Sequence, residues 1–208
     1  MASRDAAQQA ERSLVRACSA GLDVAALQRE VLRSLRRLMP VDAAFFATAD
    51  PGTLLFTGAY AEVPLDTASA QFLDNEFRDT DVNRFSALTR APSPVASLDT
   101  ATRADRWASL RYRKIMRPLG LGDELRAALM VDGHCWGYLC LHREDTELGF
   151  SPSETALLAR LGPHIAHGIR SAVLLAGSPH RPGDARPGVV GLTEDLDVVA
   201  VTPEAELL

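Results

Sequence analysis

Four side chains that commonly bind metals fall within nine residues of the chain, at His134, Cys135, Cys140 and His142. A metal site needs three or four such groups to converge on one ion at about 2.0 to 2.3 Å. Alternate residues of a strand point to opposite faces, so Cys135 lies opposite the other three, and at most three could cooperate. The same alternation does not favour a disulfide, and no neighbouring base would activate either thiol. We therefore predict no catalytic residue, no metal and no cofactor.

Aromatic side chains form a second set, because apolar ligand pockets are lined mainly by aromatic and aliphatic residues. They occur in the middle of the chain and in the hairpin that follows it, where a sheet and the middle segment could enclose one concavity. The candidate pocket residues are Phe85, Trp107, Tyr112, Leu129, Trp136 and Tyr138. The competing interpretation is that they belong to the hydrophobic core, as aromatic residues at helical or strand spacing generally do.

A hairpin over residues 125–141 positions three of these candidates. Its turn, Asp132-Gly133, predicts a two-residue type I′ loop, because both central residues of that loop need positive φ. A regular hairpin with this turn places Leu129 opposite Trp136. One face then carries Leu125, Leu129, Trp136, Tyr138, Cys140 and His142, and the other carries Ala128, Met130, Cys135, Gly137, Leu139 and Leu141.

The remaining segments alternate between helical and strand patterns. Apolar residues at helical spacing predict helices within 1–22 and over 23–39, and Asp23 is a candidate N-cap. Two apolar runs at 43–48 and 54–60 flank a Pro-Gly turn and predict a hairpin. Further helices are expected around residues 72–77 and over 107–119. A capping box at Ser151 begins the last helix.

The formal net charge of −5 is distributed unevenly over the 208 residues. Residues 189–208 carry five acidic and no basic side chains, so the rest of the chain is neutral. It lacks the net basic face that nucleic-acid binding requires, and no apolar run approaches the roughly 20 residues of a membrane helix. Proline and glycine over 176–188 predict a linker, and 189–208 predicts a hairpin followed by a helix start.

Five short stretches resemble a known family. They are DVNRF (81–85), RYR (111–113), RPLGLGDELR (117–126), WGYL (136–139) and FSPSE (150–154). Together they resemble the GAF-like sensor regions of actinobacterial LuxR-type transcriptional regulators. The resemblance implies an α+β fold, with a central antiparallel sheet, the N- and C-terminal helices on one face and a helical and irregular middle segment on the other.

The resemblance also implies a domain order. An N-terminal helix (1–22) precedes a GAF-like sensor domain (23–175), and the linker (176–188) leads to a truncated, PAS-like segment (189–208). Regulators of this type carry a helix-turn-helix domain that binds DNA, and this chain contains none. We therefore expect no direct contact with nucleic acid and none with a membrane. Unpaired cysteines without a signal peptide imply a cytoplasmic location.

We expect a non-enzymatic sensory module that binds an unknown small molecule, forms a homodimer, or does both, and thereby controls a DNA-binding domain. The residues expected on the dimer helices are Val24, Leu27, Val31, Leu35, Leu158, Leu161, Ile165 and Ile169. Two alternatives remain open. One is a pure dimerisation module whose pocket is filled, and the other is a thiol-based GAF-fold reductase, which needs an accessible thiol of lowered pKa.

Overall fold

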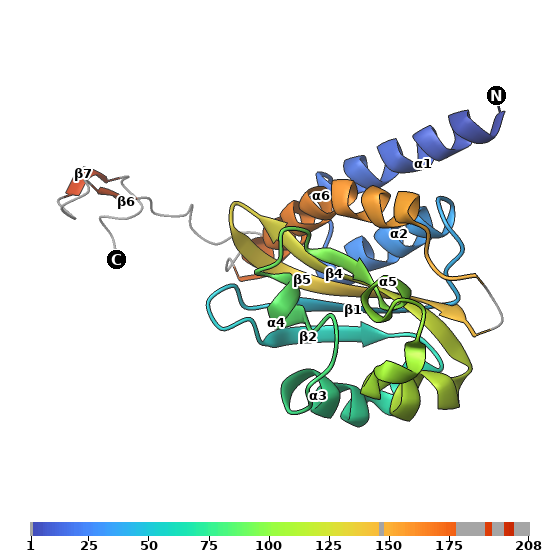
Figure 1. Ribbon diagram of the computed structural model, residues 1–208. Coiled ribbons are helices and arrows are strands. Elements are labelled where there is room, and N and C mark those ends of the chain that lie inside the picture. The colour runs from blue at the N-terminus through green and yellow to red at the C-terminus, as the bar shows by residue number, and fades with distance from the viewer. Residues whose placement is uncertain (1, 146–147, 178–189, 193–197, 202–208) are drawn as a thin grey trace. The chain divides into compact units, whose positions relative to one another are not determined.

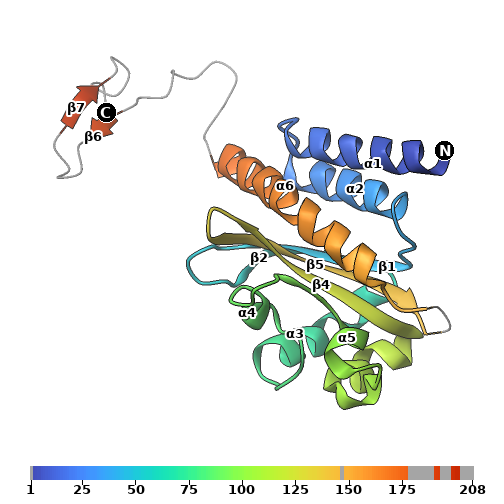
Figure 2. The same cartoon turned by 45° about the horizontal axis from the view of Figure 1, so that its top comes forward.

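The computed structural model describes residues 2–145, 148–177, 190–192 and 198–201. The chain divides into two compact units, Met1–Leu175 and Ala176–Leu208. Figures 1 and 2 show that the first unit is a sheet between two layers of helices.

The second unit contains one described strand pair. Strands β6 (Val190–Leu192) and β7 (Val198–Val201) are antiparallel, as the predicted hairpin requires. Most of the predicted linker, the acidic turn and the helix start at Thr202 lie outside the described residues. The assignment of this segment to a PAS-like module stays a prediction.

Five antiparallel strands form the sheet of the first unit, in the order β2-β1-β5-β4-β3. Their bounds are β1 (Ala43–Ala49), β2 (Phe56–Ala61), β3 (Val95–Ser97), β4 (Leu121–Val131) and β5 (His134–Glu144). Strand β1 and most of the β4–β5 hairpin are buried on both faces, whereas the edge strand β2 is largely exposed. A sheet that is apolar on both faces must be covered on both, and the predicted α+β architecture is confirmed.

Three long helices cover one face of this sheet: α1 (Ala2–Cys18), α2 (Val24–Arg36) and α6 (Pro152–Gly177). The predicted caps are confirmed. Asp23 Oδ1 accepts a hydrogen bond from the backbone of Ala26 at 2.7 Å, which begins α2. At the start of α6, the Ser151 N–H donates to Glu154 Oε2 at 2.8 Å and the Glu154 N–H donates to Ser151 Oγ at 3.3 Å, which is a reciprocal capping box.

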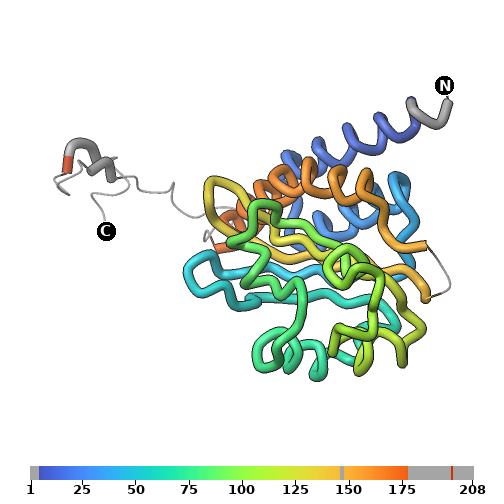
Figure 3. Tube along the Cα trace, in the orientation of Figure 1, coloured from blue at the N-terminus to red at the C-terminus, as the bar shows by residue number. Residues whose placement is uncertain are grey.

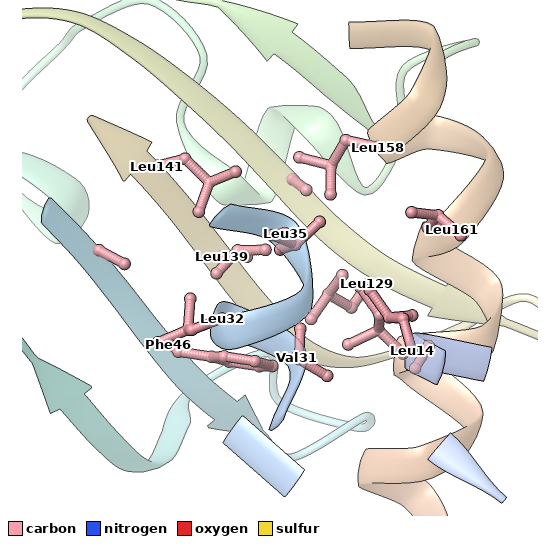
Figure 4. Packing of buried hydrophobic residues seen from close by; sticks show 14 of the residues in the cluster. Leu14, Val31, Leu32, Leu35, Phe46, Leu129, Leu139, Leu141, Leu158 and Leu161 are labelled. Carbon is pink, nitrogen blue, oxygen red and sulfur yellow. The ribbon is translucent and has the colours of Figure 1, made fainter. Parts of the chain in front are cut away.

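The helix-side cluster is the apolar core between these helices and the sheet, and Figure 4 shows part of it. All eight residues predicted on the dimer helices lie in or against this cluster. Val24 is partly buried, and the other seven have at most 2 % of their surface exposed. These side chains hold the helices on the sheet of their own chain and are not surface contacts, which corrects their assignment to an interface. Each of these helices is amphipathic, and its apolar side faces the core of its own domain.

The turn of the β4–β5 hairpin agrees with its prediction, and the register beyond it does not. Asp132 and Gly133 have φ angles of 51° and 75°, as a type I′ turn requires. Leu129, however, pairs with Gly137 and not with Trp136. A bulge at this point adds one residue to β5, so the predicted pairing is wrong from Trp136 onward.

The bulge exchanges the two faces of one strand relative to the other. Leu129 lies in the helix-side cluster together with Leu139, and Trp136 packs against that cluster. Tyr138 and Cys140 lie on the opposite face. The predicted common face of Leu129, Trp136 and Tyr138 is therefore wrong.

Short helices and turns cover the second face of the sheet, as the tube in Figure 3 shows in green. Three are α-helical: α3 (Ser69–Phe77), α4 (Phe85–Leu88) and α5 (Leu98–Thr102). This layer also contains the 3-10 turn η1 (Leu65–Ala68). Three short turns replace the single helix predicted over 107–119: the 3-10 turns η2 (Arg106–Ala108) and η4 (Arg117–Leu119) and the π-helical turn η3 (Tyr112–Met116). In the part of the chain that the structure describes, no helix has the length and apolarity needed to cross a bilayer.

Candidate functional site

The apolar cavity is a hollow of about 260 Å³ on the second face of the sheet. Strands β1 and β2 form its floor, and η1, α3 and η3 form its walls. It is lined by Phe45, Phe56, Ala59, Ala61, Leu65, Asp66, Ser69, Phe72, Leu73 and Ile115. Asp66 and Ser69 are exposed, so the polar groups lie at the rim and the interior offers hydrocarbon surface. Such a hollow is suited to an apolar molecule.

Strand alternation in β1 connects this cavity to the opposite face. Phe45 points to the second face, where its ring centroid lies 4.7 Å from that of Phe72 on α3. The next residue, Phe46, lies in the helix-side cluster, and its carbonyl accepts a hydrogen bond from Gln28 Nε2 of α2 at 3.3 Å. One strand therefore contacts both the cavity and a terminal helix.

The arginine cavity, of about 220 Å³, lies beside the apolar cavity on the same face. It is lined by Thr53, Leu54, Leu55, Phe56, Glu76, Phe77, Arg84, Phe85, Ser86, Arg90 and Tyr138. Phe56 lines both cavities. Its ring centroid is 5.7 Å from that of Phe45 on one side and 5.3 Å from that of Tyr138 on the other. The Phe56 ring therefore forms a wall common to the two cavities.

The predicted pocket residues do not form one concavity. Phe85 and Tyr138 line the arginine cavity, where their rings stack with centroids 4.3 Å apart. Tyr112 is buried on the same face, and its hydroxyl donates to Asp145 Oδ1 at 3.1 Å. Trp107 packs edge-on against Tyr112 but is 51 % exposed.

Leu129 and Trp136, the last two predicted pocket residues, face the terminal helices and line neither cavity. The β5 bulge is the physical reason, because one added residue reverses the faces of β5 relative to β4.

A buried ion network lies beneath the two cavities, and Glu124 of β4 is at its centre. Arg111 Nη2 is 2.7 Å from Glu124 Oε2, and Arg111 Nε donates to the same oxygen at 2.8 Å. Arg126 Nε is 3.4 Å from Glu124 Oε1, and Arg126 Nη1 donates to Glu76 Oε2 at 2.9 Å. All four side chains are at most 3 % exposed. Removing one partner of such a buried pair costs about 3 to 5 kcal/mol.

The network fixes the segment that walls the cavities. Glu76 Oε1 accepts a hydrogen bond from the Phe85 N–H at 2.8 Å, which joins α3 to the start of α4. The Arg126 guanidinium lies 4.0 Å from the centroid of the Phe85 ring. Asp81 accepts a hydrogen bond from the backbone N–H of Arg111 at 2.5 Å. Asp81, Arg111 and Arg126, from the DVNRF, RYR and RPLGLGDELR stretches, thus support the cavity walls.

Burial and charge shift the pKa values of this network in opposite directions. Burial raises the pKa of Glu124, but attraction to Arg111 and Arg126 outweighs it and lowers the pKa to about 2. Burial lowers the pKa of His142 to about 4, although Glu124 opposes the shift. At neutral pH the network therefore holds a charged carboxylate beside a neutral imidazole.

Glu124, Cys140 and His142 are the three described residues whose grouping fits a metal ion, with donor atoms within 4.8 Å of one another. The prediction that Cys135 and Cys140 lie on opposite faces is wrong, because the bulge in β5 places both on the second face. His134 is exposed at the turn. Two guanidinium groups already contact Glu124, at 2.7 and 3.4 Å. These cations oppose a metal ion at the same carboxylate, so the group belongs to the ion network.

The three cysteines do not fit thiol catalysis. All are buried, and burial raises the pKa of both Cys18 and Cys140 to about 12. Burial also raises the pKa of Cys135. A catalytic thiol needs an accessible thiolate, so the structure disfavours the reductase alternative.

None of the predicted pocket residues lines the apolar cavity. Phe45 and Phe56 lie in predicted strands and Phe72 in a predicted helix, but their pattern in the sequence did not assign them to a pocket. The adjacent pair Phe45-Phe46 was the available signal, because alternation places one ring on each face of a buried strand. The ion network was missed because nothing local shows that Glu124, just before the predicted hairpin, and Arg126, within it, are buried.

Comparison with known proteins identifies the fold. A model of the GAF domain family matches residues 23–169, which is more than half of the chain. A search of curated protein sequences gives no match.

Several solved structures are similar to this one. The GAF domain of a phosphoenolpyruvate-protein phosphotransferase from Coxiella burnetii has a TM-score of 0.55 at 16 % identity, over 83 % of this chain and 98 % of that one. The corresponding domain from Acinetobacter has a TM-score of 0.53 at 14 % identity, over 81 % and 95 %. A GAF domain/HD domain protein from Geobacter sulfurreducens has a TM-score of 0.51 at 20 % identity, over 76 % and 98 %. At these identities the similarity shows the fold alone.

Proposed function

Because this chain belongs to the GAF domain family, a family of sensory and regulatory modules, we propose that it binds a small apolar molecule in the apolar cavity and thereby regulates a domain attached to it. The observation that carries the proposal is the cavity itself, about 260 Å³ lined largely by aromatic and aliphatic side chains. The proposal assigns no catalytic step to the chain.

Strand β1 supplies the route from ligand to output. A ligand in the cavity contacts Phe45 of β1. The next residue of the same strand, Phe46, packs under α2. A ligand shifts an equilibrium only by binding two arrangements with different affinity. The two arrangements in this proposal differ in how α1, α2 and α6 pack on the sheet, and these helices connect the sensor to the rest of a longer protein.

The attached domain that we propose is the DNA-binding domain of a LuxR-type transcriptional regulator. The support for it is the resemblance of the DVNRF, RYR and RPLGLGDELR stretches, which contribute Asp81, Arg111, Glu124 and Arg126 to the network beneath the cavities. In such a regulator this chain acts in the cytoplasm, as a homodimer, and the contact with DNA belongs to another domain.

Ala59→Trp tests the cavity. Ala59 lines the cavity but is exposed on the edge strand β2, so an indole there fills the hollow without displacing buried side chains. We expect decan-1-ol or 1-naphthol at ten times its Kd to raise the melting temperature of the unmodified chain by about 3 to 6 °C. Differential scanning fluorimetry should show no such rise for Ala59→Trp.

Thr57→Trp is the matched control, because it adds the same side chain to the same strand at an exposed position that does not line the cavity. It should keep the full rise in melting temperature. The proposal fails if neither probe stabilises the unmodified chain. It also fails if Ala59→Trp responds to both probes as the control does.

A further inference from the structure

The two cavities differ in charge, and the difference orients a ligand. At the rim of the apolar cavity the exposed carboxylate of Asp66 is the charged group. The arginine cavity is lined by two arginines, Arg84 and Arg90, and by one carboxylate, Glu76. Both oxygens of Glu76 already accept hydrogen bonds, from Phe85 N–H at 2.8 Å and from Arg126 Nη1 at 2.9 Å. An anionic group is thus repelled at one end and attracted at the other.

Arg84 lacks a partner for its charge. Among the described residues neither Arg84 nor Arg90 has a hydrogen bond or an ion pair to its side chain, and Nε of Arg84 is buried without an acceptor. A buried donor without an acceptor is destabilising, and a carboxylate is an acceptor that guanidinium groups bind strongly. The arginine cavity therefore offers two uncompensated cations.

The position of the Phe56 ring determines whether one molecule can occupy both cavities. Its partly buried ring lies between them, in contact with Phe45 toward the apolar cavity and with Tyr138 toward the arginine cavity. It is the first residue of β2, next to the irregular pairing at Ala49. Because Phe56 is the residue that lines both hollows, one molecule that uses both requires its ring to rotate away.

On the basis of the proposed function, we propose that the ligand is an amphipathic monocarboxylate. Its apolar body fills the apolar cavity and its carboxylate reaches past Phe56 to Arg84 and Arg90. At about 30 Å³ per heavy atom, the apolar cavity of about 260 Å³ holds about nine heavy atoms of the ligand's apolar body. An acyl or arylalkyl chain of about that length fits, and a cation does not.

Three probes with the same ten-carbon body test this inference: decanoate, decan-1-ol and decylammonium. Isothermal titration calorimetry of the whole chain, below the concentration at which the probes form micelles, gives the three Kd values. We expect decanoate to bind at least tenfold more tightly than decan-1-ol and decylammonium to bind more weakly than either. Arg84→Gln should bring decanoate to the affinity of decan-1-ol and leave that of the alcohol unchanged.

Arg78→Gln, an exposed arginine just after α3 that lines neither cavity, is the matched control and should leave all three affinities unchanged. Arg90→Gln provides a second test, with the same expected direction, if Arg84→Gln does not fold. Phe56→Trp should thicken the wall between the cavities, so that the preference for decanoate is lost while decan-1-ol still binds.

The outcomes separate this inference from the proposed function. Equal affinities for decanoate and decan-1-ol overturn the inference and leave the apolar site intact. A tenfold preference for decanoate that survives both arginine substitutions also overturns it, because the preference would then come from elsewhere. Failure of all three probes to bind contradicts the proposed function itself.

Discussion

Glu124 lies between Arg111 and Arg126 in the interior of the domain, where an isolated charge would be very costly. The pairing makes the carboxylate more stable as an anion, while the same burial keeps His142 neutral. Neither ring nitrogen of His142 has a hydrogen-bond partner among the described residues. Protonating this imidazole therefore places a further charge in a site whose carboxylate already contacts two cations.

The sign of the resulting pH dependence follows from these shifts. The pKa of His142 falls from 6.5 to about 4 on folding, so below pH 6.5 the unfolded chain binds a proton that the folded chain does not. Stability is therefore lost as the pH falls from 6.5 toward 4, at about 1 kcal/mol per pH unit for this one group. Glu124 adds to the loss only below its ordinary pKa of 4.5.

His142→Leu should remove this part of the pH dependence. Urea unfolding at several pH values between 6.5 and 4.5 gives the free energy of unfolding, and its slope against pH should be smaller by about 1 kcal/mol per unit in the variant. His167→Gln, at an exposed position of α6, is the matched control. Equal slopes for His142→Leu and the unmodified chain would show that the buried imidazole does not titrate in this way.

At the scale of secondary-structure elements, strand β5 determines how closely the helices pack on the sheet. Gly137 follows the bulge and lies close to both β1 and α6. A Cβ atom at this position would be 2.5 Å from the carbonyl oxygen of Ala47 and 2.9 Å from Cδ1 of Ile169. The missing side chain thus allows α6 to pack on the sheet, and the bulge directs Trp136 toward the helices.

Gly137→Ala should lower the free energy of unfolding by about 1 to 3 kcal/mol, because backbone on one side and a core side chain on the other leave little room to adjust. Gly52→Ala is the control, since the nearest atom to its Cβ, Asp50 Oδ1, is at an ordinary contact distance of 3.5 Å. That change should stay within about 0.5 kcal/mol. Chemical denaturation measures both, and equal effects would contradict the close approach.

At the scale of the whole molecule, the two faces of the sheet in the first unit have different roles. The helix-side cluster holds α1, α2 and α6 on the sheet, and the opposite face carries both cavities. Because the apolar stripes of α2 and α6 pack within the domain, a dimer cannot form through them. Exposed apolar residues remain at the end of α6, where Leu175 is 58 % exposed.

Light scattering with size-exclusion chromatography tests the homodimer. We expect a mass twice the 22.4 kDa of one chain, with dissociation on dilution. Leu175→Glu places a charge on the exposed end of α6 and should shift the equilibrium toward monomer. Ala70→Glu, at an exposed position of α3 on the other face, is the control. A monomeric mass at the highest attainable concentration would contradict the dimer.

Local patterns in the sequence determined the order of the main elements and several of their ends. The cap at Asp23, the capping box at Ser151 and the turn at Asp132 each depend on residues within a few positions of one another, and the structure confirms all three. The short motifs also identified the fold. These features could be read without the structure because the interactions that fix them are local.

Only the tertiary structure decided the register of β5, the burial of the charges and the place of the cavities. The bulge at Trp136 depends on how the strand fits between its neighbours. The burial of Glu124 depends on arginines and helices distant in the sequence. The cavities are spaces that remain where side chains of β1, β2 and α3 do not fill the volume between them. Each arises from packing between segments, which no local pattern encodes.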